Sequence, residues 1–124
     1  MKIKIYYHHT DCGGVVYYAN YLKFFEEART EYFAQQGFSI KDLADLGTMF
    51  VVARQEIDYK APAVYGDEIE VKSNIREKTG VKIIFEHETY NQKGILLNKA
   101  ITILVCVGKD LKPKAIPEDI RNKL

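Results

Sequence analysis

The sequence predicts an α+β fold in which a curved antiparallel sheet wraps around one long central helix. Residues 17–36 repeat apolar side chains at three- and four-residue steps, as a helix with a broad apolar face does. Residues 50–107 instead alternate polar and apolar side chains in stretches that Pro, Gly and Asn separate, the pattern of strands joined by hairpins. An antiparallel sheet must bury one face, and the long helix is the large apolar element available to cover it.

The first part of the chain predicts one strand, one loop and two helices. Residues 2–8 alternate polar and apolar side chains, which predicts a strand with one solvated face. Residues 10–14 contain an Asp and a pair of Gly, which predict a turn or loop. The long helix follows over residues 17–36, and Gly37 is placed to end it in a left-handed cap. Residues 39–46 predict a short second helix that a serine caps.

The second part of the chain predicts strands alone. Their ranges are 50–59, 69–75, 81–85 and 95–107. The last is a long apolar run, which predicts either the central strand of the sheet or a strand at a subunit interface. Because an exposed apolar edge invites association, we expect it to pair with another subunit. The tail carries Pro113 and Pro117, and we expect it to fray.

Composition excludes several classes of function. The length of 124 residues predicts one domain over residues 1–124, and the formal net charge of +1, without a basic run, argues against a nucleic-acid partner. No apolar stretch approaches the ~20 residues of a membrane span, and the N-terminus does not resemble a signal peptide. Cys12 and Cys106 lack metal-ligand spacing. These features predict a cytoplasmic protein that requires no metal or cofactor.

The most informative stretch places Asp11 in a glycine-rich loop that leads into the long helix. The first turn of a helix offers unpaired backbone N–H groups and a partial positive charge, which polarise a carbonyl and stabilise an oxyanion. A carboxylate beside such donors can attack the carbonyl or activate a water molecule. For a lone loop of this kind, an Asp that only organises the turn is the more common case.

A family resemblance strengthens the enzymatic interpretation. It is carried by Asp11-x-Gly13-Gly14-Val15-Val16-Tyr17, Asn20-Tyr21-Leu22, Glu26-x-Ala28-Arg29, Ile57-Asp58-Tyr59-Lys60-Ala61-Pro62 and Gly66-Asp67. These motifs resemble the 4-hydroxybenzoyl-CoA thioesterase family and, within it, the branch of small bacterial acyl-CoA thioesterases known as YbgC. The resemblance spans nearly the whole chain. It implies a hotdog fold and a homodimer, often paired again into a homotetramer, with active sites at the subunit interface.

The resemblance also implies roles for particular residues. Asp11 matches the catalytic aspartate, and Tyr18 stands where the start of the helix supplies a backbone amide to the thioester oxygen. Because that role belongs to the backbone, the side chain at this position is free to vary, and the branch often has His there. Gly14, Val16 and Tyr17 are expected to bind the substrate.

Residues outside the loop complete the predicted site. Tyr7 is a further substrate-binding candidate through its hydroxyl. Lys60 is a candidate for the anionic phosphates of CoA. Four other basic residues could take the same part: Arg54, Arg76, Lys78 and Lys82.

The expected reaction is hydrolysis of an acyl-CoA to the free acid and CoA, with the amides near Tyr17 and Tyr18 as the oxyanion hole. Asp11 acts either as nucleophile or as general base, and the sequence favours neither route. The branch favours an aliphatic acyl group over an aryl one. An acyl-carrier protein could deliver the same thioester arm.

Two other functions stay open. A hotdog dehydratase or hydratase would need a placed His with a carboxylate partner, which the Asp11 loop does not supply. A non-catalytic module that binds acyl-CoA or acyl-carrier protein would be favoured if Asp11 proved dispensable.

The remaining polar candidates are expected to be structural. Glu26 should pair with Arg29 or with a group of the sheet, since charges three residues apart are neighbours on a helix. His8 and His87 are expected on the surface of the sheet, whereas His9, two residues from the loop aspartate, could line the pocket.

Overall fold

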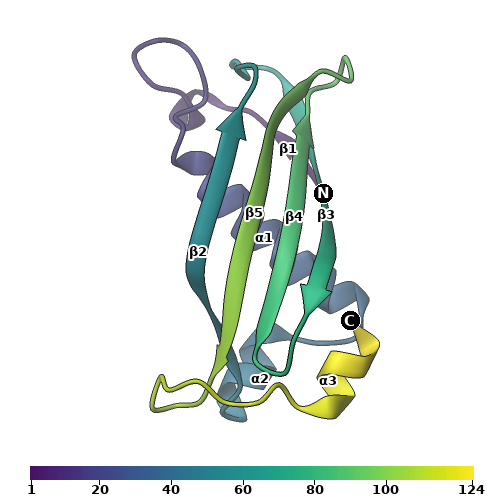
Figure 1. Cartoon of the computed structure of the whole chain (residues 1–124). Helices are drawn as coiled ribbons and strands as arrows, with labels where there is room; N and C mark the ends of the chain where they lie inside the picture. Colours follow the sequence, from purple (N-terminus) through teal and green to yellow (C-terminus); the bar gives the residue numbers. More distant parts are fainter.

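The computed structural model describes all 124 residues, which form one five-stranded antiparallel sheet and three α-helices (Figure 1). The strands are β1 (Lys2–Lys4), β2 (Met49–Tyr59), β3 (Glu68–Lys78), β4 (Lys82–Tyr90) and β5 (Leu96–Val107). The helices are α1 (Asn20–Gln35), α2 (Ile40–Asp45) and α3 (Glu118–Lys123). The strand order across the sheet is β1-β3-β4-β5-β2. This is the α+β architecture that the sequence predicts.

Helix α1 covers one face of the sheet and crosses it obliquely (Figure 1). Its apolar stripe is buried against the strands, with Tyr21, Phe25 and Phe33 at most 3% exposed. Figure 1 places the loop before α1 at one end of the molecule and the helices α2 and α3 at the other. The start of α1 therefore lies at a free end of the sheet, where a substrate can approach it.

The strands follow the period-two pattern predicted for them. Along β4, Ile83, Phe85, His87 and Thr89 are all buried, while the residues between them are partly exposed. Strand β5 lies between β4 and β2, so it is a central strand rather than an edge. The prediction that residues 95–107 pair with another subunit placed the exposed edge on the wrong strand.

The exposed apolar edge belongs to β2, whose Val51 and Val52 are 40% and 51% exposed. A register irregularity lies between Val52 and Arg54, where one residue of β2 is left without a partner on β5. The edge therefore presents apolar side chains and unpaired backbone groups together, which favours association with another chain.

Several boundaries differ from the predicted ones. Strands β3 and β4 are longer than predicted, since they continue to Lys78 and Tyr90. The first strand ends at Lys4, and a 3-10 turn over Tyr7–His9 follows it. Helix α1 begins at Asn20, because the preceding residues form the turn described below. The tail does not fray: residues 118–123 form α3, and Ile120 is 2% exposed within an apolar cluster. None of the three helices is long and apolar enough to cross a membrane.

Candidate active site

The loop that carries Asp11 is closed by hydrogen bonds of its own backbone. Asp11 N–H donates to the Val15 carbonyl at 3.0 Å, and Gly14 N–H donates to the Asp11 carbonyl at 3.0 Å. Gly14 has φ +79°, a conformation that side-chain-bearing residues rarely adopt. Gly13 N–H donates to Asp11 Oδ1 at 2.8 Å. The loop thus fixes one carboxylate oxygen, and Oδ2 accepts no hydrogen bond within the chain.

The loop is tied to the start of α1 through the carbonyl of His9. That oxygen accepts two hydrogen bonds, from Tyr17 N–H at 2.9 Å and from Asn20 Nδ2 at 2.8 Å. The His9 ring faces back toward the strand, where Nδ1 accepts from Tyr6 N–H at 2.9 Å. Burial, and then the neighbouring charge of His8, lowers the pKa of His9. His9 is therefore a structural clamp between the two sides of the site.

Three backbone amides at the start of α1 remain free, those of Tyr18, Ala19 and Tyr21. Asn20 N–H donates to the Tyr17 carbonyl at 2.9 Å, so residues 17–20 form a turn whose central residues are Tyr18 and Ala19. The N–H groups of these two residues donate to no group of the chain. The amide of Tyr17 is already committed to His9, so the free donors of the turn are one residue further along than the pair predicted.

An apolar hollow of about 310 Å³ lies beside these amides. It is lined by Val15, Val16, Tyr18, Tyr21, Tyr59, Lys60, Ala61 and Pro62. Tyr21 is 3% exposed, and burial raises its pKa to about 12, so its hydroxyl stays protonated. Lys60 contributes the one charge among the lining residues. A hollow of this kind suits an apolar group with a charged or polar group at its mouth.

The structure brings three of the seven predicted site residues together at the hollow, whereas Asp11, Gly14, Tyr17 and Tyr7 do not line it. Val16, Tyr18 and Lys60 line the hollow. Tyr17 is exposed outside it, and its pKa is raised, chiefly by a hydrogen bond with the Tyr18 side chain and in smaller part by the charge of Asp11.

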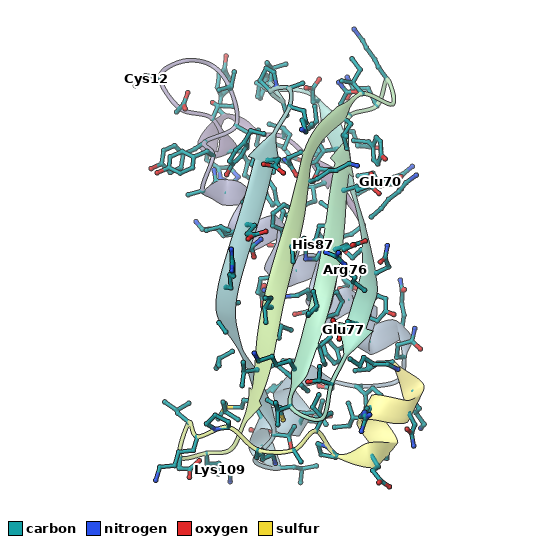
Figure 2. The ribbon with its side chains drawn as sticks, in the orientation of Figure 1. Cys12, Glu70, Arg76, Glu77, His87 and Lys109 are labelled. Atoms are coloured by element: carbon teal, nitrogen blue, oxygen red, sulfur yellow. The ribbon has the colours of Figure 1, made fainter.

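Tyr7 does not join this group. Its ring is 74% exposed and stacks on Tyr65 with 4.1 Å between the ring centroids, outside the hollow. The loop itself extends away from the sheet, with Cys12 at its outer side (Figure 2).

Most of the other basic candidates are engaged elsewhere. Arg54 pairs with Glu56 on the same strand, and Arg76 Nε lies 3.4 Å from Glu86 Oε1. Lys78 Nζ donates to two carbonyls at the end of α3, at 2.9 and 2.7 Å. These three are thus held by contacts within the fold, whereas Lys60 lines the hollow.

A second hollow, of about 220 Å³, lies on the sheet face that points away from α1. Its charged lining residues are Glu56, Asp58, Glu86, Glu88 and Lys99. Four carboxylates against one ammonium repel an anionic ligand such as CoA. This hollow is therefore not a plausible site for the thioester.

His87 corrects another expectation. It lies halfway along β4 (Figure 2), and it is 1% exposed rather than at the surface. Its ring stacks on Phe25 at 4.7 Å, Nδ1 lies 2.7 Å from Ser73 Oγ, and Nε2 has no partner. Burial, with a smaller contribution from the positive charge of Arg29, lowers the pKa of His87 to about 3. His87 is a neutral core residue.

Glu26 does not form the predicted ion pair. Its carboxylate is exposed and accepts from Thr30 Oγ1 at 3.4 Å. Arg29 instead reaches the sheet, where Nη1 donates to Thr102 Oγ1 at 3.3 Å. The charge of Glu26 still raises the pKa of Arg29, against the larger lowering by burial.

Sequence reasoning missed three features of the site. Tyr59 stands in the motif quoted for the resemblance, yet only its neighbour Lys60 was assigned a role. The free amide of Ala19 follows from the turn at residues 17–20, which has no sequence signal. The Asn20 side chain does have one, because Asn is a frequent residue at helix starts, where its side chain bonds nearby backbone.

Comparisons with known proteins identify the family of the chain. Residues 7–124 match the Thioesterase-like superfamily. The Escherichia coli protein named acyl-CoA thioester hydrolase YbgC is 38% identical over 119 residues, which cover 95% of this chain and 89% of that protein. The acyl-CoA thioesterase YbgC of Haemophilus influenzae is 38% identical over 122 residues, which cover 96% and 88% of the two chains.

A solved structure gives the same answer for the fold. The DHNA-CoA thioesterase of Staphylococcus aureus superposes with a TM-score of 0.95 over 99% of this chain and 85% of that chain, at 29% identity. The sheet wrapped around α1 is thus the hotdog fold that the loop motif implies. On the family match and the identity to these relatives, the chain belongs to the Thioesterase-like superfamily.

Proposed function

We propose that this protein is an acyl-CoA thioesterase, which hydrolyses the thioester of an acyl-CoA to the free acid and CoA. The observation that carries the proposal is the loop of Asp11, which the His9 carbonyl ties to the start of α1, where the amide N–H groups of Tyr18 and Ala19 are free. The names of its relatives in Escherichia coli and Haemophilus influenzae support the same reaction.

The free amides of Tyr18 and Ala19 act in this proposal as the oxyanion hole. They polarise the thioester carbonyl and stabilise the negative charge that develops on its oxygen. In one route, Asp11 Oδ2 bonds to the carbonyl carbon, the CoA thiolate leaves, and water then cleaves the mixed anhydride. In the other, Asp11 takes a proton from a water molecule that attacks the carbon directly, the C–S bond then breaks, and the departing CoA thiolate takes up the proton.

The hollow beside the amides supplies the acyl-binding surface. Its largely apolar wall suits a hydrocarbon or aryl acyl group, and Lys60 at the wall suits the anionic part of CoA. The relatives named acyl-CoA thioesterase and DHNA-CoA thioesterase leave the acyl class to experiment. An acyl-carrier protein would present the same pantetheine thioester.

We place the subunit contact at β2 rather than at β5. The exposed valines of this edge strand favour pairing with the same strand of a second copy, in a homodimer or a homotetramer. Tyr59 and Lys60, at the end of the same strand and just beyond it, connect this edge to the hollow.

The test is thiol release from short-chain, long-chain and aryl acyl-CoAs by wild type and by Asp11→Asn. We expect turnover by wild type and a loss of about a hundredfold or more in the variant, the scale of a positioned acid–base group. Asp110→Asn is the matched control, because Asp110 Oδ1 likewise accepts a backbone N–H two residues ahead, from Lys112 at 3.0 Å. It should retain wild-type turnover.

Two results would contradict the proposal. Equal turnover by wild type and Asp11→Asn would remove Asp11 from the chemistry. Tight binding of acyl-CoA by both proteins without thiol release would replace the enzyme with a binding or scaffolding module.

A further inference from the structure

We propose that Tyr59 is a positioning residue for this reaction, because its hydroxyl holds the peptide group that carries the free amide of Ala19. The inference rests on the proposed thioesterase function and adds a residue to it. Tyr59 ends the edge strand β2, and Tyr18 precedes α1, so the contact joins two segments 41 residues apart in sequence.

The contact is short and geometrically fixed. Tyr59 Oη donates to the Tyr18 carbonyl oxygen at 2.9 Å. The Tyr59 ring meets the Tyr21 ring edge to face, with 5.9 Å between centroids and 64° between planes. Because Tyr21 is 3% exposed and fully packed, it holds the Tyr59 ring from the side of the core.

The hydrogen bond acts on the Ala19 amide through one peptide unit. The carbonyl of Tyr18 and the N–H of Ala19 belong to the same planar group, so fixing one end fixes the other. A hydrogen bond to the carbonyl also polarises the N–H, and it strengthens the bond that this N–H makes. The preceding peptide unit is fixed in the same manner, because the Tyr17 carbonyl accepts from Asn20 N–H.

No other group donates a hydrogen bond to the Tyr18 carbonyl. The residue at the N-cap position is Ala19, which has no side-chain acceptor or donor. The peptide groups that carry the Tyr18 and Ala19 amides are held through their carbonyls. The Tyr17 carbonyl accepts from the backbone of α1, and the Tyr18 carbonyl accepts from Tyr59. Without the phenol hydroxyl, the peptide between Tyr18 and Ala19 would be free to rotate away from an oxyanion.

The ring and the hydroxyl of Tyr59 have separable effects. The ring lines the hollow, so it contacts the acyl group in both ground and transition states and acts on KM. The hydroxyl acts on an amide whose hydrogen bond strengthens as the oxyanion forms, so it acts on kcat. Burial raises the pKa of Tyr59, so the hydroxyl remains a protonated donor at neutral pH.

The test is Tyr59→Phe, which keeps the ring and removes the hydroxyl. We expect kcat to fall about tenfold, the value of one hydrogen bond in the transition state, with KM within about twofold of wild type. Tyr90→Phe is the matched control, because Tyr90 Oη likewise makes one hydrogen bond, to Glu88 Oε2 at 2.8 Å on the sheet. It should leave both constants unchanged. Tyr59→Leu, which also removes the ring, should raise KM in addition.

A spectroscopic measurement keeps the inference testable if turnover of a variant is difficult to interpret. Loss of the bond to the Tyr18 carbonyl should move the amide proton resonance of Ala19 upfield in Tyr59→Phe, and Tyr90→Phe should leave it in place. An unmoved Ala19 resonance would overturn the inference, as would a kcat for Tyr59→Phe within twofold of wild type.

The result for Asp11→Asn separates this inference from the proposed function. If that variant loses turnover and Tyr59→Phe retains it, the positioning role fails and the thioesterase stands. If wild type releases no thiol, the proposed function fails and the positioning role fails with it.

Discussion

Asp11 is exposed, yet its carboxylate is oriented by the backbone of its own loop. The bond from Gly13 N–H to Oδ1 leaves Oδ2 as the oxygen without a hydrogen bond. The geometry depends on the absence of a side chain at residue 13, since a Cβ there would lie 3.1 Å from Asp11 Oδ1. Gly13 thus helps to orient the Asp11 carboxylate, through its N–H and through the absence of a side chain.

Gly13→Ala tests this dependence. The new methyl group should displace the Asp11 carboxylate by a few tenths of an ångström and lower kcat about tenfold, because catalytic groups lose rate when misplaced. Gly80→Ala is the control, since a Cβ at residue 80 meets open space and Gly80 lies outside the left-handed region. Equal kcat values for the two variants in thiol-release assays would show that the carboxylate is not held by this contact.

His87 predicts a pH dependence of stability. Burial lowers its pKa to about 3, whereas an unfolded His titrates near about 6.5. Between these values the unfolded chain binds a proton that the folded chain does not, so the free energy of unfolding rises with pH. The stability that neutral His87 contributes is fully present above about pH 6.5 and is lost as the pH falls toward about 3.

Denaturant unfolding of wild type and His87→Gln at several pH values checks this prediction. Near pH 5 the free energy of unfolding should rise less steeply with pH in the variant than in wild type. The difference in slope should be up to about 1.4 kcal/mol per pH unit, the value for one proton. The variant should also be less stable at neutral pH, because Gln cannot stack on Phe25 as the imidazole does. Parallel pH profiles for the two proteins would show that His87 is not buried in its neutral form.

At the scale of elements, periodicity predicted the sheet and the long helix well, because burial imposes it. The same period of two that identified Ile83 and Phe85 as inward-facing also places His87 on that face, and its polarity concealed this. The turn that delays α1 to Asn20 depends on the His9 carbonyl, a contact between loop and helix that no local pattern contains.

The missed helix α3 has a similar explanation. Proline usually signals a break, but at a helix start its missing N–H costs nothing, and Pro117 occupies that position. The helix is stabilised by tertiary packing, since Ile116 and Ile120 join the apolar cluster around Phe33 and Phe85. A short helix of this kind is not encoded by its own sequence alone.

Ile120→Ala tests the contribution of α3. Removing a 2%-exposed isoleucine should lower the free energy of unfolding by about 2–4 kcal/mol, as cavities in apolar cores do. Below the unfolding transition, turnover should be unchanged, because α3 lies at the end of the molecule opposite the Asp11 loop (Figure 1). Leu46→Ala, at an 82%-exposed residue, should leave stability unchanged. Similar unfolding curves for both variants would mean that the tail is not docked.

At the scale of the whole molecule, the composition of the strands indicated association, but the sheet topology decides where it occurs. A long apolar run is the signature both of a central strand and of an interface strand, and only the strand order separates them. The order puts β5 inside the sheet and leaves β2 at the edge. The sequence could therefore predict that a strand associates with another subunit, but not which strand lies at the edge of the sheet.

Val52→Glu tests the interface that we place at β2. Wild type should sediment at twice the monomer mass or more, and a buried charge at the edge should weaken association by about tenfold or more. Turnover should fall with it, because the hollow lies beside this edge. Ile95→Glu, at a 47%-exposed isoleucine of the β4–β5 hairpin, should leave the mass unchanged. A monomeric wild type would contradict the assembly.

The central claim is that Asp11 performs chemistry on a bound acyl thioester. The measurement that tests it most directly is binding and single-turnover hydrolysis of one acyl-CoA, carried out on the same preparations of wild type and Asp11→Asn. We expect affinities within about threefold of each other and a single-turnover rate at least about a hundredfold lower in the variant. A variant that hydrolyses the bound thioester at the wild-type rate would contradict the claim, and so would a wild type that binds the thioester and leaves it intact.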